Sequence, residues 1–334
     1  MATIKEIAQE SGFSPSTVSR LLSNDTSLSV SPETKEKILN TALSLGYERK
    51  YIKTIIEKIA LLFWITEIEE LEDIYFRDMR LNIEKYANEN NMELIIIKKQ
   101  DGINKIPKDI NGFIAVGGFS DKDISKLLKI TKNGVFIDSN PAPDYYDSVQ
   151  PNTPLITKKA IDFFIKNGHS NIGFIGGTYH NPNTNLEEKD IREISFRDYI
   201  QKLGQLNENN IFIEPNFSVD SGYKSAKKAI EILGDNLPTA FFVASDPIAI
   251  GVLQALNECN ISVPSRVSVI SINNIDVAKY VSPPLSTFDI DINELCKIAI
   301  NLLAERIIEE RKLQKTIFLN SELILRKSFV IEEK

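Results

Sequence analysis

From residue 58 onward, short apolar runs alternate with segments whose apolar residues recur at helical spacing. The strand-like runs are IALLFWI, ELIII, GFIAVGG, GVFIDS, NIGFIGG, AFFVASD and VSVISIN. The helical segments include IYFRDMRLNIEKYANEN, TPLITKKAIDFFIKNG, REISFRDYIQKLG and SGYKSAKKAIEILG. This alternation is typical of parallel sheets joined by crossover helices, and it continues for longer than one sheet needs. We therefore predict an α/β body of two lobes, with a ligand cleft outside the carboxyl ends of the strands.

The first 46 residues follow a different pattern, which predicts three short helices. Thr3 and Glu6 have the spacing of a capping box. The Ser-Pro pairs at 14–15 and 31–32 each supply an N-cap and a first-turn proline. Apolar residues spaced three and four apart along each helix are expected to close one small core. They are Ile4, Ile7, Ala8, Val18, Leu21, Leu22, Ile38, Ala42 and Leu45.

The outward face of the second helix is small, polar and cationic, since it carries Ser16, Thr17, Ser19 and Arg20. Hydroxyl groups and helix N-termini bind phosphates, and an arginine bridges O6 and N7 of guanine. Two helices joined by a tight turn, the second with such a face, meet the requirements of a helix-turn-helix DNA reader. The alternative is a helical cap that packs on a larger protein.

The segment TIKEIAQESGFSPSTVSRLLSNDTSLSVSPETKEKILNTALSLGY resembles, nearly position for position, the headpiece of the LacI/GalR family of bacterial transcriptional repressors. The specific part is T-V-S-R followed by V-S, T, I and L-G-Y. The resemblance implies base contacts from Pro15, Ser16 and Arg20. It implies phosphate contacts from Ser14, Thr17, Ser19 and Thr34. The family's usual R-V-L-N is replaced here by RLLS at 20–23, so an asparagine contact to the backbone is lost or passes to Asn24.

The linker after L-G-Y departs from the family. The usual Pro-Asn and short helix, with a leucine that wedges into the minor groove, are replaced by ERKYIKTIIEKIALL. Ile52, Ile55 or Ile56 is a candidate wedge. The alternative is a plain linker that enters the first strand.

The resemblance extends over essentially the full chain and implies a periplasmic-binding-protein-like core of type I, in which the chain crosses between the lobes three times. The implied organisation is a helix-turn-helix domain at 1–47, a hinge at 48–58 and an effector-binding and dimerisation core at 59–334. Within the core, the N-lobe would take about 59–156 and 288–319, and the C-lobe about 157–287 and 320–330.

The same resemblance implies a set of effector-binding residues in the cleft. DIREISFRDY is similar to the family's Arg-x-x-Gly-Phe helix start, although Ser195 stands where glycine is usual; FFVASDPIAIG and SINNID are similar to two further cleft loops. The implied residues are Asp138, Arg192, Phe217, Ser245, Asp246 and Asn273. An arginine fork and an asparagine amide satisfy vicinal sugar hydroxyls, and an aromatic ring covers the apolar side of a sugar.

Several of these assignments have a structural alternative. Arg192 can form a surface ion pair with Glu188 or Asp198. Phe217 can belong to the core, and Asn273 can be only a turn former. Asp246, which precedes a proline, can be the N-cap of a helix that begins at that proline, and we favour this as its main role.

Enzyme motifs are missing from the sequence. It has no G-x-G-x-x-G, no G-x-x-x-x-G-K-[ST] and no G-x-S-x-G. His169 and His180 are expected in loops, without a partnered nucleophile or metal-ligand spacing, and the two cysteines support neither a disulfide framework nor a zinc site. We expect no enzymatic activity, no cofactor and no metal.

The net charge of −7 disfavours a protein that coats nucleic acid by bulk attraction. No secretory signal and no apolar stretch of about 20 residues is present, so we expect a cytoplasmic protein without a membrane partner. No heptad tail follows LILRKSFVIEEK, so a tetramer built by a C-terminal helical bundle is not expected.

The function that the resemblance implies is a homodimeric repressor of a sugar-utilisation operon. Its two heads would occupy a pseudo-palindromic operator, and a small sugar bound in the cleft would release it. The strings REISF, SINNID and YYDSV look closest to the galactoside-type branch. The alternatives are a cytoplasmic sugar-binding protein and a corepressor-type regulator whose ligand strengthens DNA binding.

Overall fold

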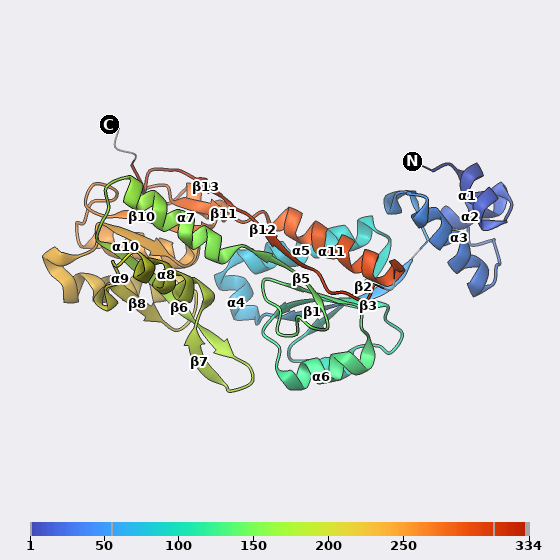
Figure 1. Ribbon diagram of the computed structural model, residues 1–334, viewed down its shortest axis with the longest axis horizontal. Coiled ribbons are helices and arrows are strands. Elements are labelled where there is room, and N and C mark those ends of the chain that lie inside the picture. Colours follow the sequence, from blue (N-terminus) through green and yellow to red (C-terminus); the bar gives the residue numbers. More distant parts are fainter. Residues whose placement is uncertain (1, 55, 310, 331–334) are drawn as a thin grey trace.

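The computed structural model describes residues 2–54, 56–309 and 311–330. A helical head, a first α/β lobe and a second α/β lobe follow one another along the long axis of the molecule (Figure 1). The first lobe lies between the other two parts. The predicted fold class, a helix-turn-helix head followed by a two-lobed α/β core with parallel sheets, is therefore confirmed.

The head consists of α1 (Ile4–Ser11), α2 (Pro15–Leu22) and α3 (Pro32–Ser44). The predicted capping box begins α1: Glu6 N donates to Thr3 Oγ1 at 3.3 Å, and Thr3 N donates to the Glu6 carboxylate at 2.7 Å. Ser14 and Ser31 are the N-caps of α2 and α3. The three apolar stripes meet in one buried cluster, which confirms the predicted head core for every residue but Leu45. The prediction for Leu45 is wrong: α3 ends at Ser44, and Leu45 is its C-cap, 39% exposed.

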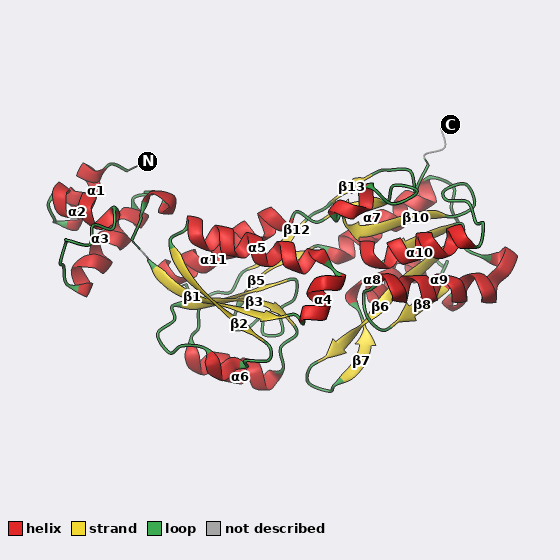
Figure 2. Ribbon diagram, turned by 180° about the vertical axis from the view of Figure 1, so that it is seen from behind, coloured by secondary structure: helices red, strands yellow, loops and turns green. Residues whose placement is uncertain are grey.

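The first lobe is a parallel sheet covered on both faces. Its strands are β1 (Glu57–Trp64), β2 (Met92–Lys98), β3 (Gly112–Gly117), β4 (Gly134–Ile137), β5 (Asp147–Pro151) and β12 (Thr316–Leu319), in the order β12-β5-β4-β3-β1-β2. Its helices are α4 (Glu67–Glu72), α5 (Ile74–Glu89), α6 (Asp121–Ile130) and α11 (Ile292–Glu309). In Figure 2, α5 and α11 lie on one face and α6 on the other. Because both faces are buried, β1 reads as a continuous apolar run.

The second lobe has a similar sheet with two antiparallel additions. Its strands are β6 (Ile172–Asn181), β7 (Leu186–Lys189), β8 (Ile211–Glu214), β9 (Ala240–Val243), β10 (Ser268–Asn273), β11 (Ser286–Asp289) and β13 (Glu322–Ile324). The order is β13-β11-β10-β9-β6-β7, and β8 pairs with β6. β7 is antiparallel to β6, and β13 is antiparallel to β11. The helices are α7 (Thr153–Lys166), α8 (Ile191–Lys202), α9 (Val219–Leu233) and α10 (Asp246–Glu258).

Short 3-10 helices complete the chain; they are η1 (Arg49–Tyr51), η2 (Ile103–Lys105), η3 (Glu208–Asn210), η4 (Gly234–Asn236) and η5 (Asp276–Lys279). Within the described residues the chain passes between the two sheets after β5, after β11 and after β12. The loops at the carboxyl ends of the strands therefore face one another across the gap between the lobes. No helix in the described part of the chain is long and apolar enough to cross a membrane.

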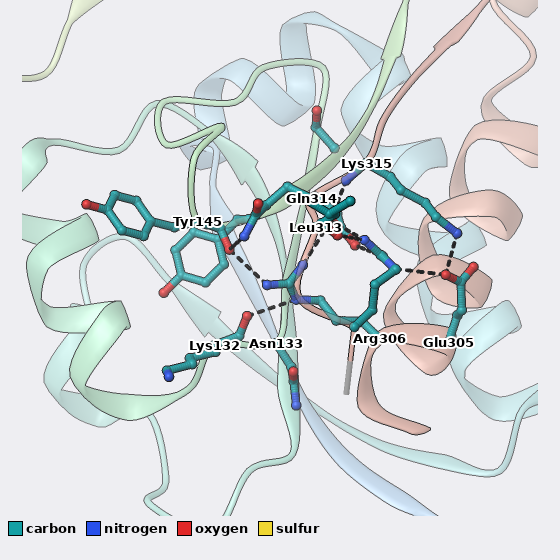
Figure 3. A network of polar contacts seen from close by, with 12 residues as sticks. Lys132, Asn133, Tyr145, Glu305, Arg306, Leu313, Gln314 and Lys315 are labelled. Atoms are coloured by element: carbon teal, nitrogen blue, oxygen red, sulfur yellow. Dashed lines mark hydrogen bonds and ion pairs between the residues drawn. The ribbon is translucent and has the colours of Figure 1, made fainter. Parts of the chain in front are cut away.

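A buried carboxylate fastens the segment between α11 and β12 to the first lobe. Figure 3 shows Glu305, Arg306 and Lys315 of this segment. Asp147, at the start of β5, is completely buried. It accepts hydrogen bonds from Arg306 Nη1 at 3.0 Å, from Arg311 Nη2 at 2.5 Å and from Lys315 N at 2.8 Å. Arg306 also donates to the carbonyl of Tyr145 at 3.0 Å. These contacts tie α11 and the approach to β12 to the edge of the sheet.

The linker between head and core is folded rather than free. Ile52 is completely buried in the head core, so in this structure it is not a wedge exposed to DNA, and that assignment of Ile52 is wrong here. Lys53 N donates to the carbonyl of Leu22 at 2.7 Å. Arg49 pairs with Glu57 through two hydrogen bonds of 2.7 and 2.9 Å. Of the two other candidate wedges, Ile56 packs partly buried against the head cluster, and Ile55 lies outside the described residues.

Candidate functional site

The outward face of α2 carries the hydroxyl groups that the sequence predicts. Pro15, Ser16 and Ser19 are exposed. Ser14 Oγ accepts a hydrogen bond from Thr17 N at 3.0 Å and lies 2.8 Å from Thr17 Oγ1. The N-terminus of α2 is therefore open to solvent, and an exposed helix N-terminus is a place where phosphate groups bind.

The other predicted contacts in the head lie near this face. Thr34 is half-buried in the first turn of α3, where its hydroxyl lies 3.0 Å from Ser31 Oγ. Asn24 is exposed in the loop after α2, with a φ of 55°. Asparagine tolerates this left-handed conformation better than most residues do.

Arg20, the predicted base-reading residue, is held by its own chain. Its Nε donates to Asp25 Oδ2 at 2.7 Å, and its Nη2 donates to Ser27 Oγ at 2.8 Å. Hydrogen bonds from Ser27 and Arg20 lower the pKa of Asp25 to about 2. The Arg20 side chain keeps 42% of its surface exposed. To contact a base, Arg20 would therefore exchange its hydrogen bonds with Asp25 and Ser27 for bonds to DNA, and no fully buried ion pair would have to break.

On the first lobe, two carboxyl groups lie at the side that faces the second lobe. Asp138 directly follows β4 with a φ of 69°, and its Oδ1 accepts a hydrogen bond from Tyr75 OH at 2.8 Å. Asp73 is the N-cap of α5, and it accepts from Tyr75 N at 3.1 Å. Burial raises the pKa of both Asp73 and Asp138 to about 6.

Arg192 faces these carboxyl groups from the second lobe. It lies in the first turn of α8, where its Nε donates to Asp190 Oδ1 at 2.6 Å and its Nη1 donates to the Ala244 carbonyl at 3.1 Å. The pKa of Asp138 and the pKa of Asp73 are raised by burial, and the positive charge of Arg192 partly opposes that rise in both. The ion-pair partner of Arg192 is Asp190, not Glu188 or Asp198, so that alternative is wrong.

Phe217 lies under this arginine. The guanidinium carbon of Arg192 is 4.3 Å from the centre of the Phe217 ring, which is the arrangement of a cation–π contact. Phe217 is half-buried and packs against the core of the second lobe. The ring thus has both of the roles that the sequence left open: it borders the core, and it supports a cleft residue.

Ser245 and Asp246 begin α10 at the same edge. Ser245 is 1% exposed, and its Oγ is one of two buried side-chain polar atoms without a hydrogen-bond partner in the described part of the chain; the other belongs to Ser225. Ser245, not Asp246, is the N-cap of α10, and it makes no side-chain capping bond. The expected N-cap role of Asp246 is therefore wrong, because the helix begins one residue earlier than predicted.

Asp246 is completely buried and bonds only to its own lobe. It accepts hydrogen bonds from Ser271 Oγ, from Thr287 Oγ1 at 2.7 Å and from Ile275 N at 2.8 Å. Burial raises the pKa of Asp246 to about 7. These contacts tie the start of α10 to β10 and β11, so Asp246 supports the strand that ends at Asn273.

Asn273 is the last residue of β10. It has a φ of 119° and 7% exposure, and its side chain forms no hydrogen bond with any described residue. The neighbouring Asn274, by contrast, donates to Asp289 at 2.8 Å and accepts from Arg326 at 2.7 Å. The amide of Asn273 therefore remains available for a ligand, while Asn274 secures the turn.

The sequence reasoning missed Asp73, Tyr75 and Asp190. The first and last of these are helix N-caps, and an acidic residue before an apolar helical pattern is a signal that can be found in sequence. The placement of His180 was wrong, because His180 lies in β6 and its Nδ1 is 2.7 Å from Glu187 Oε1. His169 is in a loop, as expected, and its Nδ1 lies 2.9 Å from Thr239 Oγ1.

Metal binding finds no support in the described ranges, which contain no group of three or more His, Cys, Asp or Glu side chains that could hold an ion. The cleft instead presents a guanidinium, two carboxyl groups, a hydroxyl and an amide beside an aromatic ring. Such a set matches the donors, acceptors and apolar face of a polyhydroxylated ligand.

Comparison with known proteins gives matches over the whole chain. The pattern of bacterial regulatory proteins of the lacI family matches residues 3–50, and that of periplasmic binding protein-like domains matches residues 161–329. The HTH-type transcriptional regulator GanR of Bacillus subtilis (strain 168) is 55% identical over 98% of this chain and 99% of its own length. The HTH-type transcriptional regulator LacR of Lactobacillus helveticus is 42% identical over 100% of both chains.

Solved structures share the fold at lower identity. The transcriptional regulator CelR in complex with cellobiose is 19% identical, with a TM-score of 0.70, and the match covers 98% of this chain and 100% of that one. The lac repressor dimer bound to operator and the anti-inducer ONPF is 19% identical, with a TM-score of 0.70, and the match covers 98% of each chain. Both matches extend over head and core together.

Proposed function

The chain belongs to the LacI family of bacterial regulatory proteins, and from this membership we propose that it is a homodimeric repressor of a galactoside-type sugar operon in the cytoplasm. Its two heads bind the half-sites of a pseudo-palindromic operator. A small sugar in the cleft between the lobes releases it. The protein is a DNA-binding transcriptional regulator and not an enzyme.

The observation that carries the sugar proposal is that the cleft holds an oriented arginine beside polar groups that have no hydrogen-bond partner in the part of the chain that the structure describes. Arg192 is oriented by Asp190 and Phe217. Ser245 Oγ, by contrast, is buried and lacks a partner among the described residues, and the Asn273 side chain forms no hydrogen bond with them. A buried polar group without a partner is costly, and a ligand that bonds to it recovers that cost. Sugar hydroxyls donate and accept, so they satisfy both groups.

Two assignments in the head and core follow from this proposal. The DNA contacts come from the α2 face and its surroundings, with Pro15, Ser16 and Arg20 on bases, and Ser14, Thr17, Ser19, Asn24 and Thr34 on the phosphate backbone. The domain division is 1–47, 48–58 and 59–334, with the lobes exchanging after β5, β11 and β12.

Effector binding acts by favouring one arrangement of the lobes over another. A ligand shifts such an equilibrium only by the difference between its affinities for the two arrangements. A coupling free energy of about 1 to 3 kcal/mol changes operator affinity about 5- to 150-fold. This is sufficient to change the occupancy of an operator.

The test combines a thermal-shift screen with operator retardation. Galactose, lactose, cellobiose and galactose 6-phosphate are added to the full chain, because a ligand that binds the folded state raises the unfolding temperature. A sugar that raises it should also reduce retardation of the DNA upstream of the chain's own gene. Stronger retardation with sugar would identify a corepressor response instead, and binding of sugar without any operator affinity would identify a sugar-binding protein.

A further inference from the structure

An exposed hairpin, residues 178–189, projects from the second lobe; we call it the arm. It comprises the end of β6 and all of β7, paired antiparallel from Thr178↔Lys189 to Asn181↔Leu186. Its residues are exposed or half-buried, and it is held together by polar pairs such as Asn181 Nδ2 to Glu188 Oε1 at 2.7 Å. In Figures 1 and 2 the arm extends away from its own sheet toward α6 of the first lobe.

The tip of the arm contacts the first lobe. Asp121 N, in the first turn of α6, donates to Asn183 Oδ1 at 2.7 Å, and Asn183 Nδ2 donates to Asp121 Oδ1 at 3.1 Å. Pro182 and Tyr179 also lie over Gly118: a Cβ placed on Gly118 would be 3.8 Å from Pro182 Cγ and 4.0 Å from Tyr179 OH. Gly118 directly follows β3, so the contact is at the carboxyl end of the first sheet, where the cleft opens.

The base of the arm leads directly into the effector cleft. β7 ends at Lys189, and the next residue, Asp190, is the N-cap of α8. Asp190 also orients Arg192 through hydrogen bonds of 2.6 and 3.2 Å. One ribbon therefore touches the first lobe at its tip and sets the position of a second-lobe cleft residue at its base.

We propose that the Asn183–Asp121 pair is a latch between the lobes, which closes the rim of the cleft and holds Arg192 in position for a bound saccharide. This proposal rests on the proposed function of the cleft. Asn183 and Asp121 are positioning residues, since they act on the ligand through the arm and Asp190. The ligand class is a saccharide enclosed between the two lobes.

The amide and carboxylate of the latch can be exchanged, which gives a sharp test. In Asn183→Asp the donor to Asp121 is lost and two carboxylates face each other, so saccharide affinity should fall about three- to tenfold. In Asp121→Asn an acceptor oxygen remains for Asn183, and affinity should stay within about twofold of wild type. In the double variant D121N/N183D both hydrogen bonds can form again, and affinity should return to within about twofold of wild type.

The measurement is isothermal titration of the full chain and its variants with the sugar from the panel that gives the largest thermal shift. Thr184→Ala is the matched control, because its hydroxyl contacts only Glu188 within the arm, at 3.4 Å. The control should bind like wild type. The unfolding temperature without sugar should be unchanged in all variants, since the latch is exposed.

The outcomes separate the latch from the function on which it rests. Weaker binding in Asn183→Asp with recovery in the double variant supports the latch. Unchanged or tighter binding in Asn183→Asp overturns it, and so does a loss that the double variant does not recover or that Thr184→Ala shares. If wild type binds no sugar of the panel, the proposed function fails and the latch fails with it.

Discussion

The two candidate binding sites of this molecule are built in opposite ways. The head presents exposed groups that already have partners, as Arg20 has in Asp25 and Ser27. The cleft presents buried groups, and one of them, Ser245 Oγ, has no hydrogen-bond partner in the described ranges. Acidic residues show the same contrast: hydrogen bonds lower the pKa of Asp25 to about 2, whereas burial raises the pKa of Asp138 to about 6.

This difference determines which interactions each site loses when its ligand binds. The head exchanges hydrogen bonds in high dielectric, so its affinity comes from the complementarity of many small contacts and from phosphate charge. The cleft is preorganised in low dielectric, where each group is worth more and each loss costs more. The largest effect of a single substitution should therefore be on sugar binding and not on operator binding.

The largest effect is expected from Arg192→Ala. It removes the guanidinium that lies on Phe217 and leaves the Asp190 carboxylate, only 8% exposed, without its partner. Saccharide affinity should fall by about 100-fold or more, and the free energy of unfolding of the core should fall too. Titration calorimetry and chemical denaturation measure the two effects.

Arg192→Lys separates these effects, because it keeps a charge beside Asp190 but lacks the planar fork. It should restore most of the stability and little of the affinity. Operator affinity without sugar should be unchanged in both variants. Sugar binding by Arg192→Ala within threefold of wild type would show that the cleft is not the effector site.

The next effect is expected in the head. Arg20→Ala should weaken binding to the specific operator by about 1 to 3 kcal/mol and binding to random duplex by much less, because only base contacts carry sequence information. Asp25→Ala is the matched control, since it frees Arg20 from its partner without removing the fork. Retardation assays at fixed salt should show a loss for Arg20→Ala alone. Equal losses on operator and random DNA would contradict base reading.

Ser245→Ala should have two smaller effects in opposite directions, one on the stability of the core and one on sugar affinity. The hydroxyl is buried without a partner, so its removal should raise the free energy of unfolding by about 1 kcal/mol. The same change removes a bond to the sugar and should lower its affinity about three- to tenfold. Chemical denaturation measures the free energy of unfolding of this variant, and titration calorimetry measures its sugar affinity. A loss of stability would show that Ser245 Oγ has a partner in solution.

The sequence alone predicts most of this fold and part of the cleft. The seven apolar runs that read as strands are all strands, because burial on both faces makes a parallel strand continuously apolar. The six other strands of the described residues, β5, β7, β8, β11, β12 and β13, are not among these runs, because each has only three to five residues and several are largely polar. β7 reads Leu-Glu-Glu-Lys and all four of its residues are exposed, so it has no apolar alternation to detect.

The parts of the cleft that escaped prediction depend on tertiary contacts. Asp246 accepts hydrogen bonds from Ser271 and Thr287, whereas Ser245 beside it has no partner among the described residues. This difference depends on how β10 and β11 pack against the start of α10. Adjacent residues in a sequence give no sign of such a difference. The burial of Ile52 in the head core was likewise invisible, because an isoleucine in a linker suits a wedge and a core equally.

The smallest effect concerns pH and tests the contrast between the acids directly. Because burial raises the pKa of Asp73 and Asp138 to about 6, from an ordinary value of about 4, the folded core binds protons more tightly than the unfolded chain. Their contribution therefore makes the sugar-free core more stable as pH falls from about 7 to about 4. An ionised carboxylate is the stronger acceptor for a sugar hydroxyl, so saccharide affinity should fall over the same acid shift, by about twofold to threefold. Asp25, with a pKa of about 2, stays ionised throughout this window and leaves the Arg20 fork unaffected.

Asp138→Asn separates the contribution of the cleft from that of the head. Compared with wild type, this variant should flatten the dependence of saccharide affinity on pH between 5 and 7. It should leave the pH dependence of operator binding without sugar as it was. If both dependences flattened together, the cleft acids would affect operator binding even without sugar, and the pH contrast between the two sites would not hold.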